Sequence, residues 1–115
     1  MQNMCYTIEV YEKRNKTRPF EDWLYKQDAV VRNTIAAKLT RISLGNLSTC
    51  KSLGGGINEI KIDTGPGYRI YYGLVGKKII LLLCAGHKKS QQKDIELASD
   101  YLSDYKDRGK KDGKK

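Results

Sequence analysis

Apolar and polar residues alternate near the start of the chain. In the stretch CYTIEVY, residues 5–11, the side chains of Tyr6, Ile8 and Val10 are separated by polar ones. Alternation with a period of two is typical of a strand with one buried face. The polar run at residues 12–18 interrupts this pattern. We therefore expect the first strand to end there.

The next two segments have the three- and four-residue spacing of helices. Pro19 suits the first position of a short helix. The apolar face of this helix consists of Phe20, Trp23 and Leu24. Asp28 is suited to cap a second, longer helix, and Gly45 is suited to end it. The apolar positions of the second helix are Val31, Ile35, Leu39 and Ile42. The pattern predicts a helical hairpin with one apolar face.

Loops and strands alternate after the second helix. Residues 46–56 form a polar segment ending in glycines, which we interpret as a loop. Strands are predicted at residues 57–63 and 68–74, joined by a turn with the sequence TGPG. Residues 77–84 are apolar on both faces after two lysines. A strand without alternation must be covered on both sides, so we place this one centrally in the sheet.

A final helix is predicted after Ser90, which is suited to cap it. Its inward-facing side chains are Ile95, Ala98, Leu102 and Tyr105. From Lys106 onward the sequence KDRGKKDGKK has low complexity, and we expect it to be disordered. The predicted organisation is one domain at residues 1–105 and a basic tail at residues 106–115.

The predicted order of elements is β-α-α-β-β-β-α, which indicates an α+β fold with a small, mostly antiparallel sheet. We expect the helical hairpin to pack on one face of the sheet and the other face to stay more open. The longest apolar run, residues 79–85, has the length of a strand and not of a membrane span. The first ten residues lack the pattern of a signal peptide. We therefore expect a cytoplasmic protein with no membrane partner.

The three cysteines, Cys5, Cys50 and Cys84, are widely spaced, which fits neither a disulfide framework nor a metal clamp. Their presence suits a reducing cytoplasm. Cys5 and Cys84 lie in predicted strands, where we interpret them as small core residues. With one histidine in the chain, the sequence does not indicate a structural zinc site.

The charge of the chain narrows the choice of partners. It carries 22 basic and 13 acidic residues, for a net charge of +9. The tail at residues 106–115 has six basic and two acidic residues, which leaves +5 for the rest of the chain. A basic folded domain favours a polyanionic partner, which can be RNA, DNA or an acidic protein.

A single arginine stands inside the tyrosine-rich strand PGYRIYYG. Because side chains alternate along a strand, Arg69 and Tyr71 share one face, and Glu59 and Lys61 of the preceding strand point to the same side. A patch of cations and an aromatic ring suits nucleic acid. Equally, Arg69 can pair across the hairpin with Glu59 or Asp63, as charged residues in sheets often do. The spacing leaves both alternatives open.

Four stretches together resemble a known family of bacterial toxins. They read FEDWL at 20–24, KLTRISLGN at 38–46, KSLGGGINEIKIDTGPGYRIYY at 51–72 and ILLLCAGHKKSQQKDIELA at 80–98. Their order and motifs resemble the RelE/ParE superfamily, in particular its HigB-like, phage-related branch of addiction-module killer proteins. The resemblance covers roughly residues 6–105.

The resemblance implies a small toxin held inactive by a cognate antitoxin, for which a helix-turn-helix type is expected. RelE-like enzymes cleave mRNA on the ribosome: the 2′-hydroxyl attacks the adjacent phosphate and leaves a cyclic phosphate. This chemistry uses a base, an acid and cations around the phosphorane. The resemblance implies no metal and no small-molecule cofactor.

Site residues carried over from the resemblance lie on the last three predicted strands and the loop after them. Arg69 matches the arginine at the scissile phosphate, Lys61 matches a basic residue on the neighbouring strand, and His87 stands where some relatives carry a catalytic histidine. A solvated loop histidine is an equal interpretation of His87. Further RNA-binding residues are expected at Lys51, Tyr71, Lys88 and Lys89. The C-terminal tyrosine of several active relatives is not evident here, because Tyr101 and Tyr105 have the spacing of helix packing residues.

Two other functions remain open at this point. A ParE-like protein with the same fold would inhibit DNA gyrase by binding, without catalysis of its own. A phage-derived regulator would have lost enzymatic activity. Convergence of Arg69, Lys61 and His87 on one face would favour the mRNA endonuclease.

Overall fold

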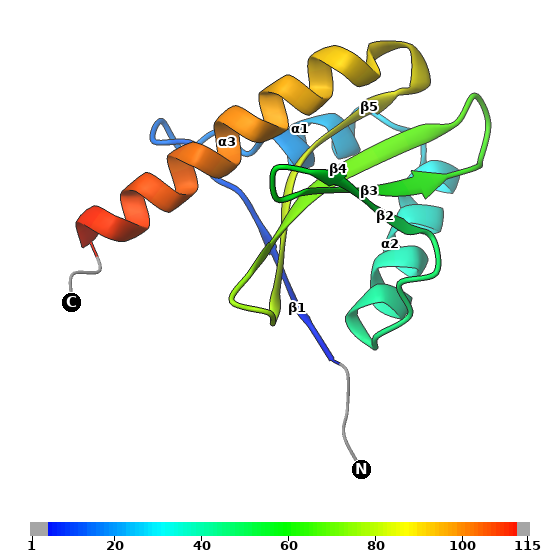
Figure 1. Ribbon diagram of the computed structural model, residues 1–115. Helices are drawn as coiled ribbons and strands as arrows, with labels where there is room; N and C mark the ends of the chain where they lie inside the picture. The colour runs from blue at the N-terminus through cyan, green and yellow to red at the C-terminus, as the bar shows by residue number, and fades with distance from the viewer. Residues whose placement is uncertain (1–4, 113–115) are drawn as a thin grey trace.

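The computed structural model describes residues 5–112. The strands are β1 (Thr7–Val10), β2 (Cys50–Gly54), β3 (Ile57–Ile62), β4 (Tyr68–Val75) and β5 (Ile79–His87), and the helices are α1 (Pro19–Tyr25), α2 (Ala29–Ser43), the short 3-10 helix η1 (Lys88–Ser90) and α3 (Gln91–Asp112). One mixed sheet has the strand order β1-β5-β4-β3-β2, with β1 parallel to β5 and the other neighbours antiparallel (Figure 1). The predicted α+β class is confirmed.

The predicted helical hairpin is confirmed, and so are the two predicted ends of its second helix, α2. The side chain of Asp28 accepts a hydrogen bond of 3.0 Å from the backbone N–H of Val31 and so caps α2. Gly45 has a φ of 103° after the last turn. The N–H groups of Gly45 and Asn46 donate to carbonyls of that turn, which is the Schellman arrangement. A glycine at this position ends the helix without a steric penalty.

The hairpin covers one face of the sheet and forms the first core with it. The alternate residues Ile60 and Ile62 of β3 and Tyr68, Ile70 and Tyr72 of β4 point into this core, as the alternation predicts. Its buried members are Phe20, Val31, Ile35, Ile42, Ile60, Ile62, Tyr68, Ile70, Tyr72, Ile80, Leu82 and Ala85. The strand predicted to be central, β5, lies between β1 and β4 and contributes to both cores.

The second face of the sheet is not open. Helix α3 crosses it on the side opposite to α1 and α2 (Figure 1) and forms a second core. The buried members of that core are Tyr11, Ile57, Tyr71, Leu81, Leu83, Cys84, Ala98 and Leu102. The prediction of a more open second face is therefore wrong, because the apolar stripe of α3 packs onto it.

A bulge in β5 changes which side chains share a face. Tyr71 pairs with Cys84, but Tyr72 pairs with Leu82, so Leu83 is an extra residue in β5. An extra residue reverses the alternation for every position beyond it. His87 is consequently paired with Tyr68 and lies on the face of the helical hairpin.

The region predicted as a loop at residues 46–56 contains strand β2. This strand pairs antiparallel with β3 at the edge of the sheet. Its sequence, CKSLG, has one exposed face and no regular alternation of apolar residues, so the strand pattern is absent from the sequence. Pairing with β3 across the glycine turn makes it a strand.

Two further expectations differ from the structure. Helix α3 continues past Tyr105 to Asp112, so residues 106–112 are helical and not disordered; residues 113–115 of the predicted tail lie outside the described residues. Cys84 is buried as predicted, but Cys5 is exposed.

None of the helices within residues 5–112 combines the length and apolar character that a bilayer-spanning segment needs.

Close contact between β5 and the start of α3 depends on Gly86. A methyl group there would lie 2.0 Å from Oδ2 of Asp94 and 2.7 Å from Oγ of Ser90. We expect Gly86→Ala to lower the free energy of unfolding by about 1–3 kcal/mol, as overpacking does, measured by urea unfolding.

Gly109 provides the matched control for this substitution. It lies in α3, and a methyl group added there would have no neighbouring atom within 4 Å. Gly109→Ala should therefore raise the free energy of unfolding by up to about 1 kcal/mol. If Gly86→Ala is as stable as the wild type, the start of α3 can move away from β5 without cost.

Candidate functional site

Arg69 lies in the middle of the sheet surface beside the start of α3. In the ladder it is paired with Lys61 of β3 on one side and with Gly86 of β5 on the other. Its Nε lies 3.1 Å from Oε2 of Glu59, and the two side chains are 12% and 7% exposed. The cross-strand pairing with Glu59 is therefore present, and it is largely buried.

The carboxylate of Glu59 is held from two sides. Its second oxygen, Oε1, accepts a hydrogen bond of 3.0 Å from Nε2 of Gln91 in the first turn of α3. The Nε atom of Arg69 is buried and makes no aligned hydrogen bond within the described residues. The Arg69–Glu59 contact is thus mainly electrostatic, and the carboxylate does not saturate the hydrogen-bonding capacity of the guanidinium.

Two hollows meet at Arg69. The larger, of about 540 Å³, is lined by Ser48, Thr49, Cys50, Lys51, Glu59, Lys61, Asp63, Arg69 and Gln91. The smaller, of about 250 Å³, is lined by Lys61, Asp63, Gly65, Pro66, Gly67, Arg69 and Lys88. Lys61, Asp63 and Arg69 belong to both, so the two hollows form one continuous polar depression, which we call the Arg69 groove.

Four of the predicted site residues line the Arg69 groove: Lys51, Lys61, Arg69 and Lys88. Lys61 is more than half exposed, and its Nζ lies 3.9 Å from Oδ1 of the still more exposed Asp63, a weak contact in water. Lys51 and Lys88 have no carboxylate within 4 Å among the side chains of residues 5–109. Cationic side chains that are free of partners are suited to bind an anion.

The other three predicted site residues lie elsewhere. Tyr71 is fully buried beneath α3, so its ring cannot stack on a base, and that prediction is wrong. Burial raises the pKa of Tyr71, and the charges of Glu59 and Asp94 act in the same direction. Lys89 is exposed in η1 and lines neither hollow.

His87 lies on the opposite side of the sheet from Arg69. Its ring packs against Tyr68 with 5.3 Å between ring centroids, and Tyr68 in turn contacts Trp23 of α1. The prediction that His87 converges with Arg69 and Lys61 on one face is wrong, because the bulge in β5 reverses the parity at its end.

The groove also contains residues that the sequence did not single out. Gln91 and the two hydroxyl residues Ser48 and Thr49 line the larger hollow. The sequence marked Gln91 only as the first residue after the predicted cap Ser90, and its contact with Glu59 depends on how α3 packs. The hydroxyls carried no signal, because residues 46–56 were interpreted as a plain loop.

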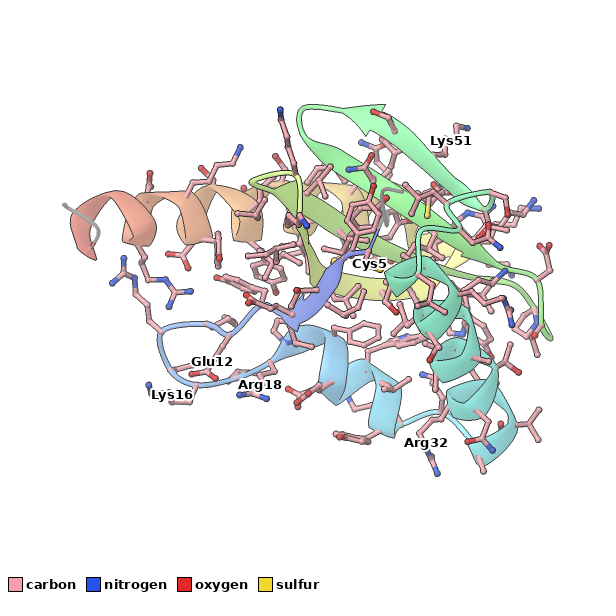
Figure 2. The ribbon with its side chains drawn as sticks, turned by 90° about the horizontal axis from the view of Figure 1, so that it is seen from below. Cys5, Glu12, Lys16, Arg18, Arg32 and Lys51 are labelled. Atoms are coloured by element: carbon pink, nitrogen blue, oxygen red, sulfur yellow. The ribbon has the colours of Figure 1, made fainter. Side chains whose placement is uncertain are left out.

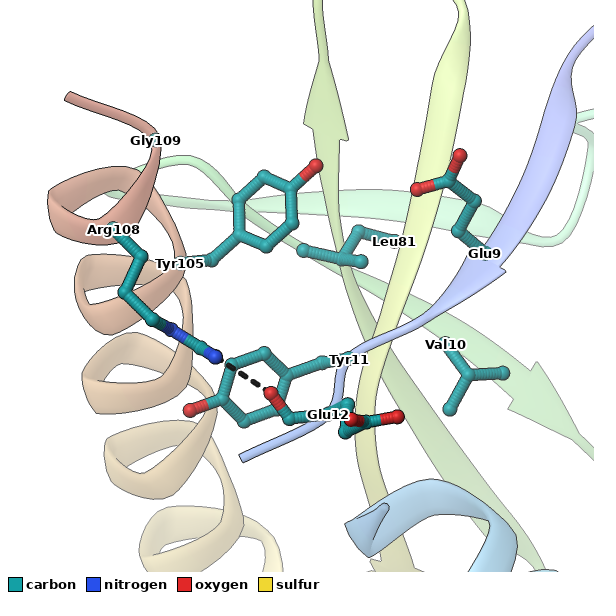
Figure 3. A pocket seen from close by; sticks show the side chains of 8 residues that line it. All are labelled: Glu9, Val10, Tyr11, Glu12, Leu81, Tyr105, Arg108 and Gly109. Carbon is teal, nitrogen blue, oxygen red and sulfur yellow. Dashed lines mark hydrogen bonds between the residues drawn. The ribbon is translucent and has the colours of Figure 1, made fainter. Parts of the chain in front are cut away.

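A third hollow, of about 370 Å³, lies between β1 and the C-terminal half of α3 (Figure 3). There Tyr11 donates a 2.6 Å hydrogen bond to Asp104, and Arg108 donates one of 2.6 Å to the backbone carbonyl of Glu12. Burial raises the pKa of Tyr11 to about 12, assisted by its hydrogen bond with Asp104. Arg108 and the nearby Arg14 are both engaged with Asp104. The contacts around this hollow therefore hold α3 against the chain after β1.

The two ion pairs of the groove should differ strongly in coupling energy. A double-mutant cycle with Glu59→Ala and Arg69→Ala should give more than about 1 kcal/mol, since removal of one partner leaves a buried charge. The exposed pair Lys61 and Asp63 is the control, and the same cycle there should give less than about 1 kcal/mol. Both are measured by denaturant unfolding. Equal coupling in the two cycles would contradict the burial of Arg69 with Glu59.

Comparison with known proteins places the chain in a family. Residues 22–102 match the family described as "Phage derived protein Gp49-like (DUF891)". The chain is 39% identical over 83 residues to an uncharacterized protein of Haemophilus influenzae, a match that spans 71% of the chain and 84% of the relative. A mutant of the E. coli toxin RelE in the free state superimposes with a TM-score of 0.61 at 18% identity, over 87% of the chain and 97% of that structure. The chain thus belongs to the Gp49-like family of phage-derived proteins and has the fold of RelE.

Proposed function

We propose that the protein is the toxin of a type II toxin–antitoxin system and that it cleaves mRNA on the ribosome. Membership of the Gp49-like family and the RelE fold support a toxin with an antitoxin partner. The observation that carries the cleavage proposal is the Arg69 groove, where a buried, fixed guanidinium is surrounded by Lys51, Lys61 and Lys88. The HigB-like assignment within the superfamily stays a prediction.

The role of Arg69 in this proposal is to stabilise the charge that develops on the phosphate. In strand cleavage the 2′-oxygen bonds to phosphorus, the bond to the 5′-oxygen breaks, and the phosphorane between them carries additional negative charge. A donor that is already oriented stabilises that charge without reorganisation during the reaction. Glu59 and Gln91 provide this orientation from below.

The proton transfers are assigned to the exposed groups at the junction of the two hollows. The 2′-hydroxyl must lose a proton and the leaving 5′-oxygen must gain one. Asp63 is the exposed carboxylate that lines both hollows and is proposed as the base; Lys61, 3.9 Å from it, is proposed as the donor. Lys88 contacts the phosphate that follows.

His87 has no part in this mechanism. Its ring packs in a tilted arrangement against Tyr68 on the other face of the sheet, and η1 follows it immediately. A role for His87 in packing of the loop after β5 is consistent with that position.

Inhibition of DNA gyrase remains the second candidate, and the RelE/ParE fold supports it equally. The preference for RNA cleavage rests on the groove, because a purely binding inhibitor has no need of a buried arginine held by a carboxylate. Both functions need an antitoxin, and a basic protein suits an acidic antitoxin segment.

Substitution of Arg69 should abolish cleavage. In translation in vitro with a defined message followed by primer extension, Arg69→Ala should lower the cleavage rate by about 10²–10³, the loss expected when one donor to a transition-state oxyanion is removed. Lys78→Gln, an exposed lysine outside the groove, is the control and should cleave as the wild type does.

Thermal unfolding of the variant separates lost chemistry from lost folding. An intact message with wild-type protein, together with a block of DNA supercoiling by gyrase, would contradict the nuclease proposal and support the alternative.

Substitution of His87 should have a small effect on the same assay. Because its side chain lies on the face away from Arg69, His87→Ala should retain cleavage within about tenfold of the wild type, less than the loss typical of a general acid or base. A loss as large as that of Arg69→Ala would show that the end of β5 rearranges on the ribosome.

A further inference from the structure

A recess next to the Arg69 groove extends the basic surface onto α2. It is small, about 20 Å³, and is lined by Lys38, Arg41, Asn46, Ser48 and Thr49. Ser48 and Thr49 also line the larger hollow at Arg69. The recess and the groove are therefore adjacent parts of one surface.

We propose that Lys38 and Arg41 bind the phosphate backbone of the RNA strand on the side of the groove away from Lys88. The strand then runs from Lys88 past Arg69 and Lys61, over residues 46–51, to α2. This inference rests on the proposed RNA substrate and adds a binding subsite to it.

The two cations are available to an external anion. They are three residues apart on α2 and so lie next to each other on its surface. Arg41 is exposed, and Lys38 is half-buried beside Ile35 and Ile42. Among residues 5–109, whose side chains the structure describes, no carboxylate lies within 4 Å of either cation. By contrast, Arg18 contacts Glu12 and Arg108 contacts Asp104.

The loop between α2 and β2 holds the recess in a fixed position relative to the groove. The carbonyl of Thr49 accepts a 3.3 Å hydrogen bond from the backbone N–H of Lys61, and the N–H of Asn46 donates to the carbonyl of Arg41. Asn46 Oδ1 also accepts from the N–H of Ser48. Both ends of the loop are thus tied to residues that carry the charges.

The strand residue Cys50 lies beside α2, where its side chain packs against the first core. Burial raises the pKa of the Cys50 thiol, while a hydrogen bond with Tyr72 and the charge of Lys38 act in the opposite direction. Lys38 therefore lies near the Cys50 thiol, on the side of β2 that faces α2.

The chemistry of the recess favours RNA over a protein segment. Its walls are cations, hydroxyls and an amide, the groups that contact phosphate and sugar oxygens in nucleic-acid complexes. A protein partner is usually anchored by apolar or aromatic side chains in pockets, and no residue lining the recess is apolar.

The test measures salt dependence, which reports phosphate contacts independently of cleavage. The probe is a labelled oligouridylate of about 12 nucleotides, within the site size of single-strand binders. For Lys38→Gln/Arg41→Gln, the slope of log affinity against log salt should become shallower by about 1.4, or about 0.7 for each lost contact. The decrease in affinity between about 50 and 200 mM salt should accordingly shrink by about sevenfold.

A charge-matched control is Lys26→Gln/Lys78→Gln. Both lysines are exposed and neither lines the groove or the recess, so the slope should stay at the wild-type value. In the translation assay, the KM of Lys38→Gln/Arg41→Gln for the ribosome–message complex should rise by more than kcat falls.

A wild-type slope in Lys38→Gln/Arg41→Gln would overturn the inference. If binding of that variant to an oligoglutamate of similar length is weakened at the same time, the recess binds an acidic protein segment instead. If the slope changes as expected but wild-type protein leaves the message intact, the subsite stands and the nuclease proposal fails.

Discussion

Burial of the Arg69 guanidinium beside the Glu59 carboxylate is the constraint around which the rest of the site is arranged. A charge removed from water is costly unless an opposite charge and hydrogen bonds replace its hydration. Glu59 supplies the charge to Arg69, and Gln91 supplies a hydrogen bond to Glu59. The chain of contacts from Arg69 through Glu59 to Gln91 therefore joins β4, β3 and the start of α3. Loss of any one of these supports would alter the direction in which the guanidinium points.

Helix α3 gives this arrangement its boundary. Its apolar stripe buries most of the second sheet face, including Tyr71. The part of that face next to the N-terminus of α3, at Arg69 and Gln91, stays accessible. Gly86 permits the close approach, because Ser90 and Asp94 occupy the space where a side chain would be. The Arg69 groove is thus what remains of a sheet face after a helix has packed across it. The buried ion pair and exposed lysines, among them Lys51 (labelled in Figure 2), line this groove.

Local patterns in the sequence predicted most of the fold but only part of the site. Caps, turns and periodicity located α1, α2 and the β3–β4 hairpin, because each depends on neighbouring residues. Parity correctly placed Arg69 and Glu59 on one face, and the alternative of a cross-strand pair is the arrangement present. What failed depends on distant contacts. No local pattern in the sequence indicates that α3 covers the face of Tyr71. Separately, the one extra residue in β5, Leu83, moves His87 to the other side of the sheet.

The ion pair also separates long-range attraction of a polyanion from direct contact with its phosphate. At the surface of the groove, Glu59 offsets much of the long-range field of Arg69, because the two opposite charges lie 3.1 Å apart. Long-range attraction of a polyanion must then come from unpaired lysines around it. On the far side of the molecule, Glu12 lies against Lys16 and Arg18 (Figure 2), so those cations attract less. Around the Arg69 groove, exposed lysines draw the polyanion in, and a single, nearly neutralised arginine provides the directed contact.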